Sequence, residues 1–317
     1  MLTFEPIQLN RRGEYLEYYR QCLEKASDYS FVNIWSWAGK YQYEWAWADD
    51  LVWLRYRYGP LYLYGAPIGA WQRDDWQKLL TENLEPHFIM TRVPEALSRI
   101  IETQMPDIVG KNQREHWEYL YNINDLIELK GSDYAAKRKL ANTFERRYAY
   151  EFRPLRIQDF PAVRTFMKGW IEQQGQRRDV NTEDFILENQ AINRLFESWK
   201  DLPEIVSGSI WINNGLAAFT ISNPETFFFA VFIAAFTIGE IVAPQTVIIH
   251  FEKASLDFIG IYQAINRRML MSLPENITCV NREQDLGLPG LRKAKTEYRP
   301  VDFIRKQKLM YQINTQE

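Results

Sequence analysis

Residues 281–300, NREQDLGLPGLRKAKTEYRP, combine residue types that could perform acyl transfer. Two acids, Glu283 and Asp285, precede Gly and Pro breakers and a dense group of cations. A buried strand could not hold so many charges, because desolvating a charge without a partner costs several kcal/mol. In acyl transfer a cation stabilises the tetrahedral oxyanion, and a base takes the proton of the nucleophile. The sequence therefore predicts that this segment closes an acyl-transfer site.

A strand followed by a helix could supply a second part of the site. Residues 246–254 have the β-branched composition of a strand, which would deliver His250, Glu252 and Lys253 to its carboxyl end. Gly260 then begins a predicted helix. Free backbone N–H groups point outward at a helix N-terminus, so this turn could bind an anion. We expect His250 to be a packed strand residue.

Helices and strands must position these residues. Aromatic residues alternate from Tyr41 to Trp47 with the period of a strand, which favours a sheet core over a base-stacking surface. Other strands are predicted at 51–58, 61–64, 117–123, 205–213, 215–221, 227–238, 246–251, 277–280 and 303–313. Helices are predicted at 72–83, 94–104, 132–148, 159–174, 182–199 and 260–272. The pentapeptide AAFTI occurs at 217–221 and 234–238, which fits either two similar strands or a local duplication. The pattern predicts an α/β (α+β) fold of mixed sheets flanked by helices.

The composition is that of a globular protein in a reducing compartment. The 317 residues are 46% hydrophobic and 25% charged, enough for about two domains. Cys22 and Cys279 provide no disulfide framework, and we expect both in the core. The uncharged run 227–239 is too short to span a membrane, and the first residues lack the pattern of a signal peptide. We therefore expect a cytoplasmic protein with no transmembrane segment.

Cations gather in two segments, 137–156 and 292–308, although the net charge is −3. A negative net charge does not indicate a DNA-binding protein. The clusters are either solvated faces or the walls of an anion-binding cleft. No spacing of Cys and His indicates a metal site, and neither a Gly-x-Ser-x-Gly elbow nor a Walker-type phosphate loop occurs.

Several of these segments resemble one bacterial family, named for the C-terminal catalytic part of phosphatidylglycerol lysyltransferase. The similar segments are HFEKA at 250–254, the helix start Gly260-x-Tyr262-x-x-Ile-Asn266, and residues 281–300. YSFVNIWSW at 29–37 and KRKLANTFERRY at 137–148 extend the resemblance over nearly the whole chain. It implies two tandem GNAT-like domains, which we place at residues 1–130 and 131–317, with the active site in the second.

The resemblance also implies which residues act. Lys295 aligns with a lysine that lysyl- and alanyl-phosphatidylglycerol synthases and Fem-type aminoacyltransferases need, so it is the candidate for stabilising the oxyanion or a donor phosphate. The general base is inferred from the residues and not from the resemblance: Glu252, at a strand end beside Lys253, is the candidate, with Glu283 and Asp285 as alternatives. We expect the donor to be bound by Lys253, Gly260, Tyr262, Asn281, Arg282, Arg292 and Lys293. We expect RNA phosphates to contact Lys137, Arg138, Arg146 and Arg147. A structural network of Glu252 and Lys253 with Asp285 and Arg292 is the alternative.

One departure from the GNAT pattern bears on the donor. In GNAT-type acyltransferases the loop Arg/Gln-x-x-Gly-x-Gly/Ala holds the pyrophosphate of coenzyme A, whereas here the corresponding stretch is Asp257-Phe-Ile-Gly260-Ile-Tyr262. Asp257 places an acid where phosphate would bind, and we expect it to cap the following helix. Aminoacyl-tRNA is therefore the expected donor, with no cofactor, and coenzyme A is the alternative.

Three functions remain open from the sequence. The first is transfer of an aminoacyl group from aminoacyl-tRNA to an unidentified small-molecule or lipid-headgroup acceptor. The second is N-acyl transfer from acyl-coenzyme A. The third is a tandem GNAT-like protein that binds a partner without catalysis. We expect the first.

Overall fold

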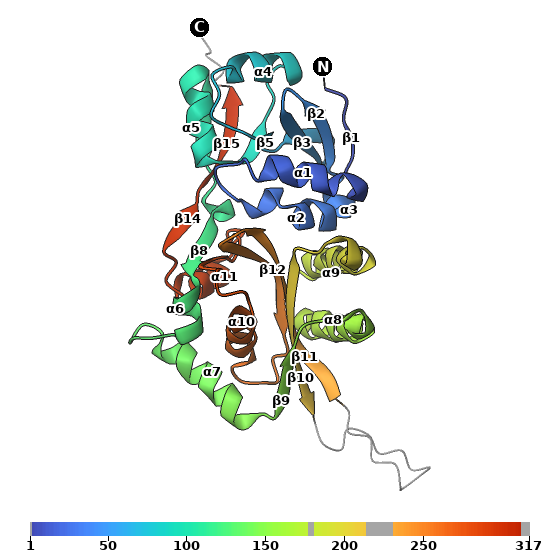
Figure 1. Cartoon of the computed structure of the whole chain (residues 1–317), viewed down its shortest axis with the longest axis vertical. Helices are drawn as coiled ribbons and strands as arrows, with labels where there is room; N and C mark the ends of the chain where they lie inside the picture. Colours follow the sequence, from blue (N-terminus) through green and yellow to red (C-terminus); the bar gives the residue numbers. More distant parts are fainter. Residues whose placement is uncertain (1, 177–180, 214–230, 312–317) are drawn as a thin grey trace. The chain divides into compact units, whose positions relative to one another are not determined.

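The computed structural model divides the chain into two compact units (Figure 1). Unit 1 contains Met1–Leu120 and Asn281–Glu317, and unit 2 contains Tyr121–Val280. The structure describes residues 2–176, 181–213 and 231–311, so the predicted strand 215–221 and the first AAFTI copy lie outside the described residues. The division differs from the expected domains 1–130 and 131–317, because the C-terminal segment packs with the N-terminal one.

Unit 1 is built around a sheet in which the strands follow the order β1-β2-β3-β4-β6-β15-β7, with β5 paired to β3. Neighbouring strands are antiparallel except β4 and β6. The strands of the sheet are β1 (Glu5–Pro6), β2 (Glu44–Ala48), β3 (Leu51–Tyr58), β4 (Leu61–Tyr64), β5 (Ile68–Gly69), β6 (Met90–Pro94), β7 (Ile108–Asn112) and β15 (Lys306–Tyr311). The helices are α1 (Arg12–Tyr19), α2 (Phe31–Ser36), α3 (Ala38–Tyr41), α4 (Trp76–Asn83), α5 (Glu95–Gln104) and α11 (Pro289–Thr296).

The position of β15 explains why the end of the chain belongs to unit 1. This strand lies between β6 and β7, so Gln307 pairs with Val93 on one side and Asn112 on the other. Figure 1 shows β15 among elements from the first third of the chain. Just before it, β14 (Asp302–Ile304) pairs with the first residues of β8 (Glu118–Asn122).

Aromatic side chains form the core of unit 1. Trp45 and Trp53 are fully buried, and the ring of Tyr15 lies 5.8 Å from the rings of both Phe31 and Trp45. Burying one aromatic side chain removes about 150–250 Å² from water, a gross contribution of about 4–6 kcal/mol. The predicted sheet core is confirmed, although the strand β2 begins three residues after Tyr41, which ends α3.

Unit 2 contains an antiparallel sheet with the strand order β12-β11-β10-β9. Its strands are β9 (Tyr150–Arg153), β10 (Ile205–Asn213), β11 (Val231–Ala243) and β12 (Thr246–Ala254), and the chain returns to unit 1 along β13 (Cys279–Asn281). Its helices are α6 (Ile123–Glu128), α7 (Ala135–Arg147), α8 (Phe160–Gly175), α9 (Glu183–Glu197) and α10 (Ile261–Met271). Helices α8 and α9 lie on one side of the sheet, and α7 and α10 on the other (Figure 1).

The periodicity of α10 positions it between the sheet and α7. Ile261, Ala264 and Ile265 follow the spacing of one helix face, and all three are buried. They pack in one cluster with Phe144 of α7 and with β10 and β11. This contact fixes the start of α10, where the sequence predicted an anion site.

Most predicted elements are confirmed with shifts of a few residues, whereas the helices α1, α2, α3 and α11 were not predicted. Pro289 and Gly290 were interpreted as breakers, whereas they form the first turn of α11, where proline needs no partner for its missing N–H. The predicted strand 303–313 corresponds mainly to two short strands, β14 and β15. Within the described ranges, no helix is long and apolar enough to cross a membrane.

Candidate functional site

The segment 281–300 folds into two tight turns followed by α11. The side chain of Asn281 accepts a hydrogen bond from the backbone of Glu283 at 2.8 Å, and the side chain of Asp285 accepts one from Gly287 at 2.9 Å. Such side-chain turns stabilise left-handed backbone, and Glu283 and Gly287 have φ of +56° and +74°. The side chains of Asn281 and Asp285 therefore determine the path of this segment.

Asp285 is the centre of a group of charged and hydrogen-bonded side chains in this segment. Its side chain is fully buried and accepts two hydrogen bonds from Arg292, at 2.8 and 2.9 Å, and one from the Tyr119 hydroxyl at 2.6 Å. Arg114 adds a contact of 3.1 Å. Burial opposes ionisation, but the bonds from Arg292 and Tyr119 lower the pKa of Asp285 to about 2. A carboxylate with so low a pKa is a weak base, so Asp285 is better suited to holding the segment in place than to accepting a proton.

Lys295 lies on α11, and its side chain bonds to the turn that Asp285 anchors. Its Nζ donates to the carbonyl oxygens of Arg282 at 2.5 Å and Gln284 at 2.6 Å. Burial lowers the pKa of Lys295 to about 8, while the negative charge of Glu283 partly opposes the shift. The result is a cation that is fixed in position and able to lose its proton close to neutral pH.

Asp28, Glu118 and Lys306 form a buried ionic cluster that is connected to this turn. Lys306 is 0% exposed and donates to both carboxylates. Ser27 donates to Glu118 through its backbone N–H and its hydroxyl, at 2.9 and 2.7 Å. Asn281 also donates to Glu118, so one side chain joins the ionic cluster to the turn at Glu283. Sequence reasoning missed this cluster.

The other residues predicted in this segment have different surroundings. We expected Arg292 to bind the donor. Its guanidinium forms an ion pair with Asp285, and its side chain is 41% exposed. The guanidinium of Arg282 lies 5.0 Å from the ring of Tyr298, and Lys293 is exposed on α11. The contact between Asp285 and Arg292, which the alternative hypothesis of a structural network predicted, is therefore present.

The remaining predicted residues belong to unit 2. Glu252 accepts a hydrogen bond from Asn266 at 3.2 Å. Lys253 pairs with Glu188 at 2.8 Å and lies 4.9 Å from the ring of Trp170. The candidate base Glu252 and the candidate cation Lys295 are thus in different compact units. His250, as expected, is packed in its strand, 3.2 Å from Glu240.

The turn between β12 and α10 packs closely against α7 at Gly260. Gly260 has φ of +86°, and a Cβ at this position would lie 2.1 Å from the carbonyl oxygen of Leu140 in α7. The expected capping role of Asp257 is wrong, because Gly260 precedes the first helical residue and Asp257 instead accepts a bond from the Ser255 hydroxyl at 2.9 Å. Tyr262, the other predicted donor contact here, packs against the core of unit 2.

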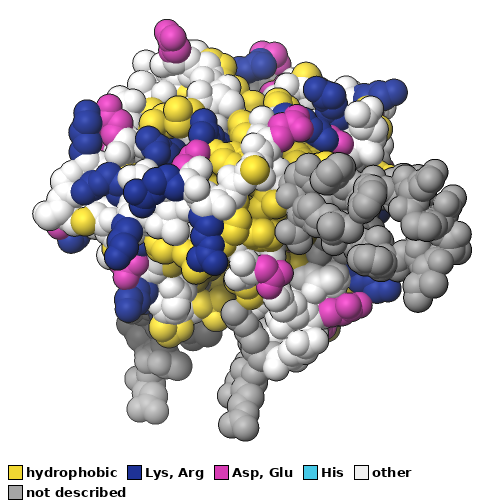
Figure 2. Space-filling model, turned by 90° about the horizontal axis from the view of Figure 1, so that it is seen from below, with side chains coloured by type: hydrophobic (Ala, Val, Ile, Leu, Met, Phe, Trp, Pro, Cys, Tyr) yellow, Lys and Arg dark blue, Asp and Glu magenta, His cyan; other side chains and the backbone are white. Residues whose placement is uncertain are grey.

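Helix α7 carries the cations expected to contact RNA. Arg138 donates to the carbonyl oxygens of Leu129 and Gly131, which stabilises the end of α6. Arg146 and Arg147 are exposed at the end of α7, and Lys137 is half-buried near its start. Figure 2 shows Lys and Arg side chains gathered beside an apolar area, on the side from which α7 and β9 are seen.

The described ranges contain no group of three or more His, Cys, Asp and Glu residues that could hold a metal ion. Cys22 and Cys279 form no disulfide bond. Cys22 is buried, as expected, and Cys279 is half-buried. Lys295 and the carboxylates of the segment 281–300 are groups that can supply electrostatic stabilisation and proton transfer.

The arrangement of two α/β units, each with helices packed on a sheet, is a tandem GNAT fold. The chain belongs to the family described as phosphatidylglycerol lysyltransferase, C-terminal, whose model matches residues 19–309. This family match includes the segment 281–300 and the turn between β12 and α10.

Three solved structures are similar over nearly the whole chain. A conserved protein of unknown function from Bacteroides thetaiotaomicron is 26% identical, with a TM-score of 0.83, and covers 98% of this chain and 100% of its own. L-PGS from Bacillus licheniformis is 15% identical, with a TM-score of 0.62 and coverage of 98% and 93%. FemX is 8% identical, with a TM-score of 0.59 and coverage of 99% and 98%. The last two establish the fold alone, and no curated protein matches the chain.

Proposed function

We propose that the protein transfers an aminoacyl group from aminoacyl-tRNA to an amine or hydroxyl acceptor. The family match supports a group-transfer activity, and the segment 281–300 supplies a fixed cation and acids. The acceptor is a small molecule or a lipid headgroup.

The observation that carries the proposal is the turn between β12 and α10. A pyrophosphate bound at a helix N-terminus needs room and free N–H donors. Here Gly260 lies against the backbone of Leu140, and Asp257 contributes a negative charge beside it. These features disfavour coenzyme A as the donor, and an aminoacyl ester of tRNA requires no such phosphate cradle.

In this proposal Lys295 stabilises the oxyanion that forms when the acceptor attacks the ester carbonyl. A donor aimed at such an oxyanion contributes about 2.7–4 kcal/mol to transition-state stabilisation. Glu283 is the candidate base in the same unit, because its charge acts on Lys295. Glu252 is retained as the alternative base.

Binding of tRNA through α7 gives a testable salt dependence. We expect the logarithm of the association constant to fall linearly with the logarithm of salt concentration, by about 0.7–0.9 for each phosphate contact. The variant Lys137→Ala/Arg146→Ala/Arg147→Ala should reduce this slope by about 2–3, because each lost phosphate contact removes about 1. Fluorescence titration with labelled aminoacyl-tRNA at several salt concentrations measures the slope.

A matched control removes three exposed cations elsewhere, Lys78, Lys111 and Lys200, and should leave the slope of the wild type. Equal slopes for the two triple variants would argue against α7 as the RNA-binding element. Competition by coenzyme A, or thiol release from acetyl-coenzyme A, would instead favour N-acyl transfer.

A further inference from the structure

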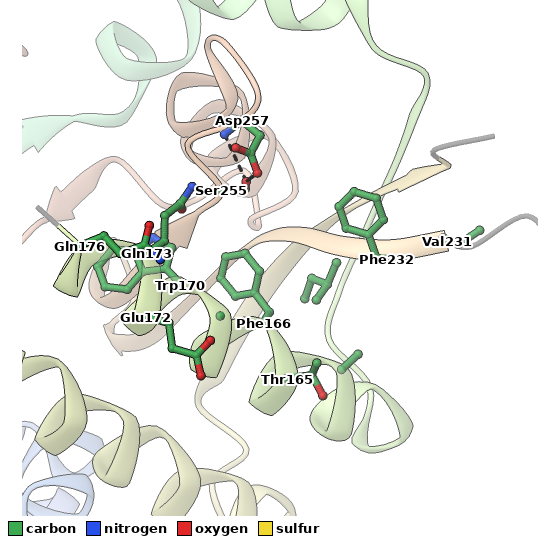
Figure 3. Close-up of a pocket in the computed structure, with 13 residues that line it drawn as sticks. Thr165, Phe166, Trp170, Glu172, Gln173, Gln176, Val231, Phe232, Ser255 and Asp257 are labelled. Atoms are coloured by element: carbon green, nitrogen blue, oxygen red, sulfur yellow. Dashed lines mark hydrogen bonds between the residues drawn. The ribbon is translucent and has the colours of Figure 1, made fainter. Parts of the chain in front are cut away.

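A pocket in unit 1 has a mainly polar lining. Its volume is about 440 Å³, which is in the usual range for small-molecule sites, about 300–1,000 Å³. Its described lining consists of Tyr18, Gln21, Asp50, Ala70, Gln72 and Arg73. The pocket beside α8 in unit 2 differs, because its lining includes the rings of Phe166, Trp170 and Phe232 (Figure 3). None of the residues identified above as candidates for transfer, donor binding or RNA contact lines the pocket of unit 1.

The hairpin turn between β2 and β3 borders this pocket. Ala48 pairs with Leu51, so Asp49 and Asp50 form a two-residue turn, and their φ angles are +58° and +57°. Such turns favour Asn-Gly or Asp-Gly, because both residues need left-handed backbone. Aspartate tolerates this conformation, but glycine adopts it without steric cost. The turn alone therefore does not explain why its second residue is Asp50.

The two aspartates of this turn have different surroundings. The backbone carbonyl oxygen of Asp49 accepts a hydrogen bond from Arg73 at 2.9 Å, and its carboxylate accepts one from Asn83 at 2.8 Å. Arg73 is itself held by two bonds to Asp75, at 2.5 and 2.8 Å. The carboxylate of Asp50 lines the pocket and makes no hydrogen bond or ion pair within the described ranges. Asp49 thus stabilises the turn, whereas Asp50 is able to bond a ligand.

An aromatic ring and two amides also line the pocket. The ring of Tyr18 lies edge-on to Trp47, with 5.5 Å between the centroids, and this contact holds its orientation. The amide of Gln72 makes no hydrogen bond within the described ranges. The amide of Gln21 donates to the carbonyl oxygen of Glu17 at 3.1 Å, which leaves its own oxygen as an acceptor. The pocket therefore combines an apolar ring with groups that donate and groups that accept hydrogen bonds.

We propose that this pocket binds an uncharged saccharide through one pyranose ring. Hydroxyl groups both donate and accept, so one sugar ring can donate to Asp50 and exchange bonds with the amides of Gln21 and Gln72. The C–H face of the sugar would lie against the ring of Tyr18. Arg73 retains N–H donors beyond its three bonds and would donate to a hydroxyl oxygen.

The presence of both charge signs favours an uncharged ligand. An anion would be repelled by Asp50, and a cation would be repelled by Arg73. A hydroxyl group meets either side chain without such a penalty, since it can donate to a carboxylate and accept from a guanidinium. The inference concerns unit 1 alone and goes beyond the proposed transfer reaction.

Ligand-observed NMR titration with a panel of uncharged sugars tests this assignment. The panel contains glucose, galactose, mannose and N-acetylglucosamine, which differ in the orientation or substitution of single hydroxyl groups. We expect at least one of them to bind with a dissociation constant below about 50 mM. Asp50→Gly should weaken this sugar at least about tenfold, because it removes a charged hydrogen-bond acceptor. Glycine suits the turn, so this variant should melt at no lower a temperature than the wild type.

A matched control removes an acid outside the pocket. Asp74→Ala replaces an exposed acid that does not line the pocket, and this variant should bind the sugar as the wild type does. Glucosamine and glucuronate test the charge of the ligand, because one carries a cation and the other an anion. We expect both to bind more weakly than the best uncharged sugar.

The assignment would be overturned if no sugar of the panel bound at about 50 mM. Wild-type affinity of the double variant Asp50→Gly/Gln72→Ala would overturn it too, because the sugar would then bind elsewhere. Tighter binding of glucosamine or glucuronate than of every uncharged sugar would instead indicate a site for amines or for anions. Because no step uses tRNA or Lys295, failure here would leave the proposed transferase function untouched, and success would not establish it.

Discussion

Replacing Lys306 with methionine is expected to lower the free energy of unfolding by about 3–5 kcal/mol, because it removes one partner from a buried ionic cluster. Lys306 is 0% exposed and is the cation shared by Asp28 and Glu118. Without it, Glu118 keeps its bonds from Ser27 and Asn281 but no longer has a buried ammonium group to compensate its charge. Urea denaturation followed by circular dichroism measures the loss.

Two further variants separate charge from packing. Lys111→Met, at an exposed site on the neighbouring strand β7, should change stability by less than about 0.5 kcal/mol. Adding Asp28→Asn and Glu118→Gln to Lys306→Met should recover part of the loss, because no uncompensated charge remains. If Lys306→Met were as stable as Lys111→Met, the cluster would contribute nothing to folding.

The effect should depend on pH in a defined direction. Burial disfavours the charged form of Lys306, but Asp28 and Glu118 outweigh it and raise the pKa of Lys306. The contribution of charged Lys306 to the free energy of unfolding is therefore full below the ordinary lysine pKa near 10.4 and is lost as pH rises through the folded-state pKa. Burial likewise opposes ionisation of Asp28, but Lys306 and Arg92 lower the pKa of Asp28. The contribution of ionised Asp28 to the free energy of unfolding is therefore present above the ordinary aspartate pKa of about 3.9 and is lost as pH falls through the folded-state pKa. The deficit of Lys306→Met should therefore decrease as pH falls, because the buried carboxylates that lose their ammonium partner take up protons.

The fold could be predicted from local patterns because its elements are long and regular. The apolar spacing of α10 has the helical period of its buried face, whereas the aromatic residues before Trp47 and the β-branched residues at 246–254 indicate buried strands by their composition. The division into units could not be obtained in this way. It depends on β15 inserting between β6 and β7, a pairing that joins the two ends of the chain and leaves no signal in either segment alone.

The ionic cluster was missed for a related reason. Asp28 and Lys306 are 278 residues apart, and a lysine in a strand is normally a sign of a solvent-facing position. Within 281–300 the sequence identified the important residues but could not separate their tasks. Asp285 and Lys295 both sit among opposite charges, and only the packing around them distinguishes an anchored carboxylate from a cation with a lowered pKa.

Replacing Lys295 with alanine is expected to reduce aminoacyl transfer about 100- to 1,000-fold, because it removes the cation assigned to the oxyanion. The measurement is release of the labelled aminoacyl group from aminoacyl-tRNA into a cell extract that supplies the acceptor, with spontaneous ester hydrolysis subtracted. Lys111→Ala, which removes an exposed lysine elsewhere in unit 1, should retain wild-type transfer. Binding of tRNA by Lys295→Ala should remain within about threefold of the wild type, since one contact is lost at most.

The pH profile distinguishes an electrostatic role of Lys295 from a purely structural one. Burial lowers the pKa of Lys295 to about 8, so the ammonium form, and with it the transfer rate, should decline above pH 8 by about tenfold per pH unit. This decline should be absent from the residual activity of Lys295→Ala. Lys295→Arg retains a positive charge at pH 9–10, so its residual rate should also be flat across this range, although the larger head group fits poorly between the carbonyl oxygens of Arg282 and Gln284. If the wild-type rate continued to rise through pH 9, neutral Lys295 would be the active form, and its role would be that of a base.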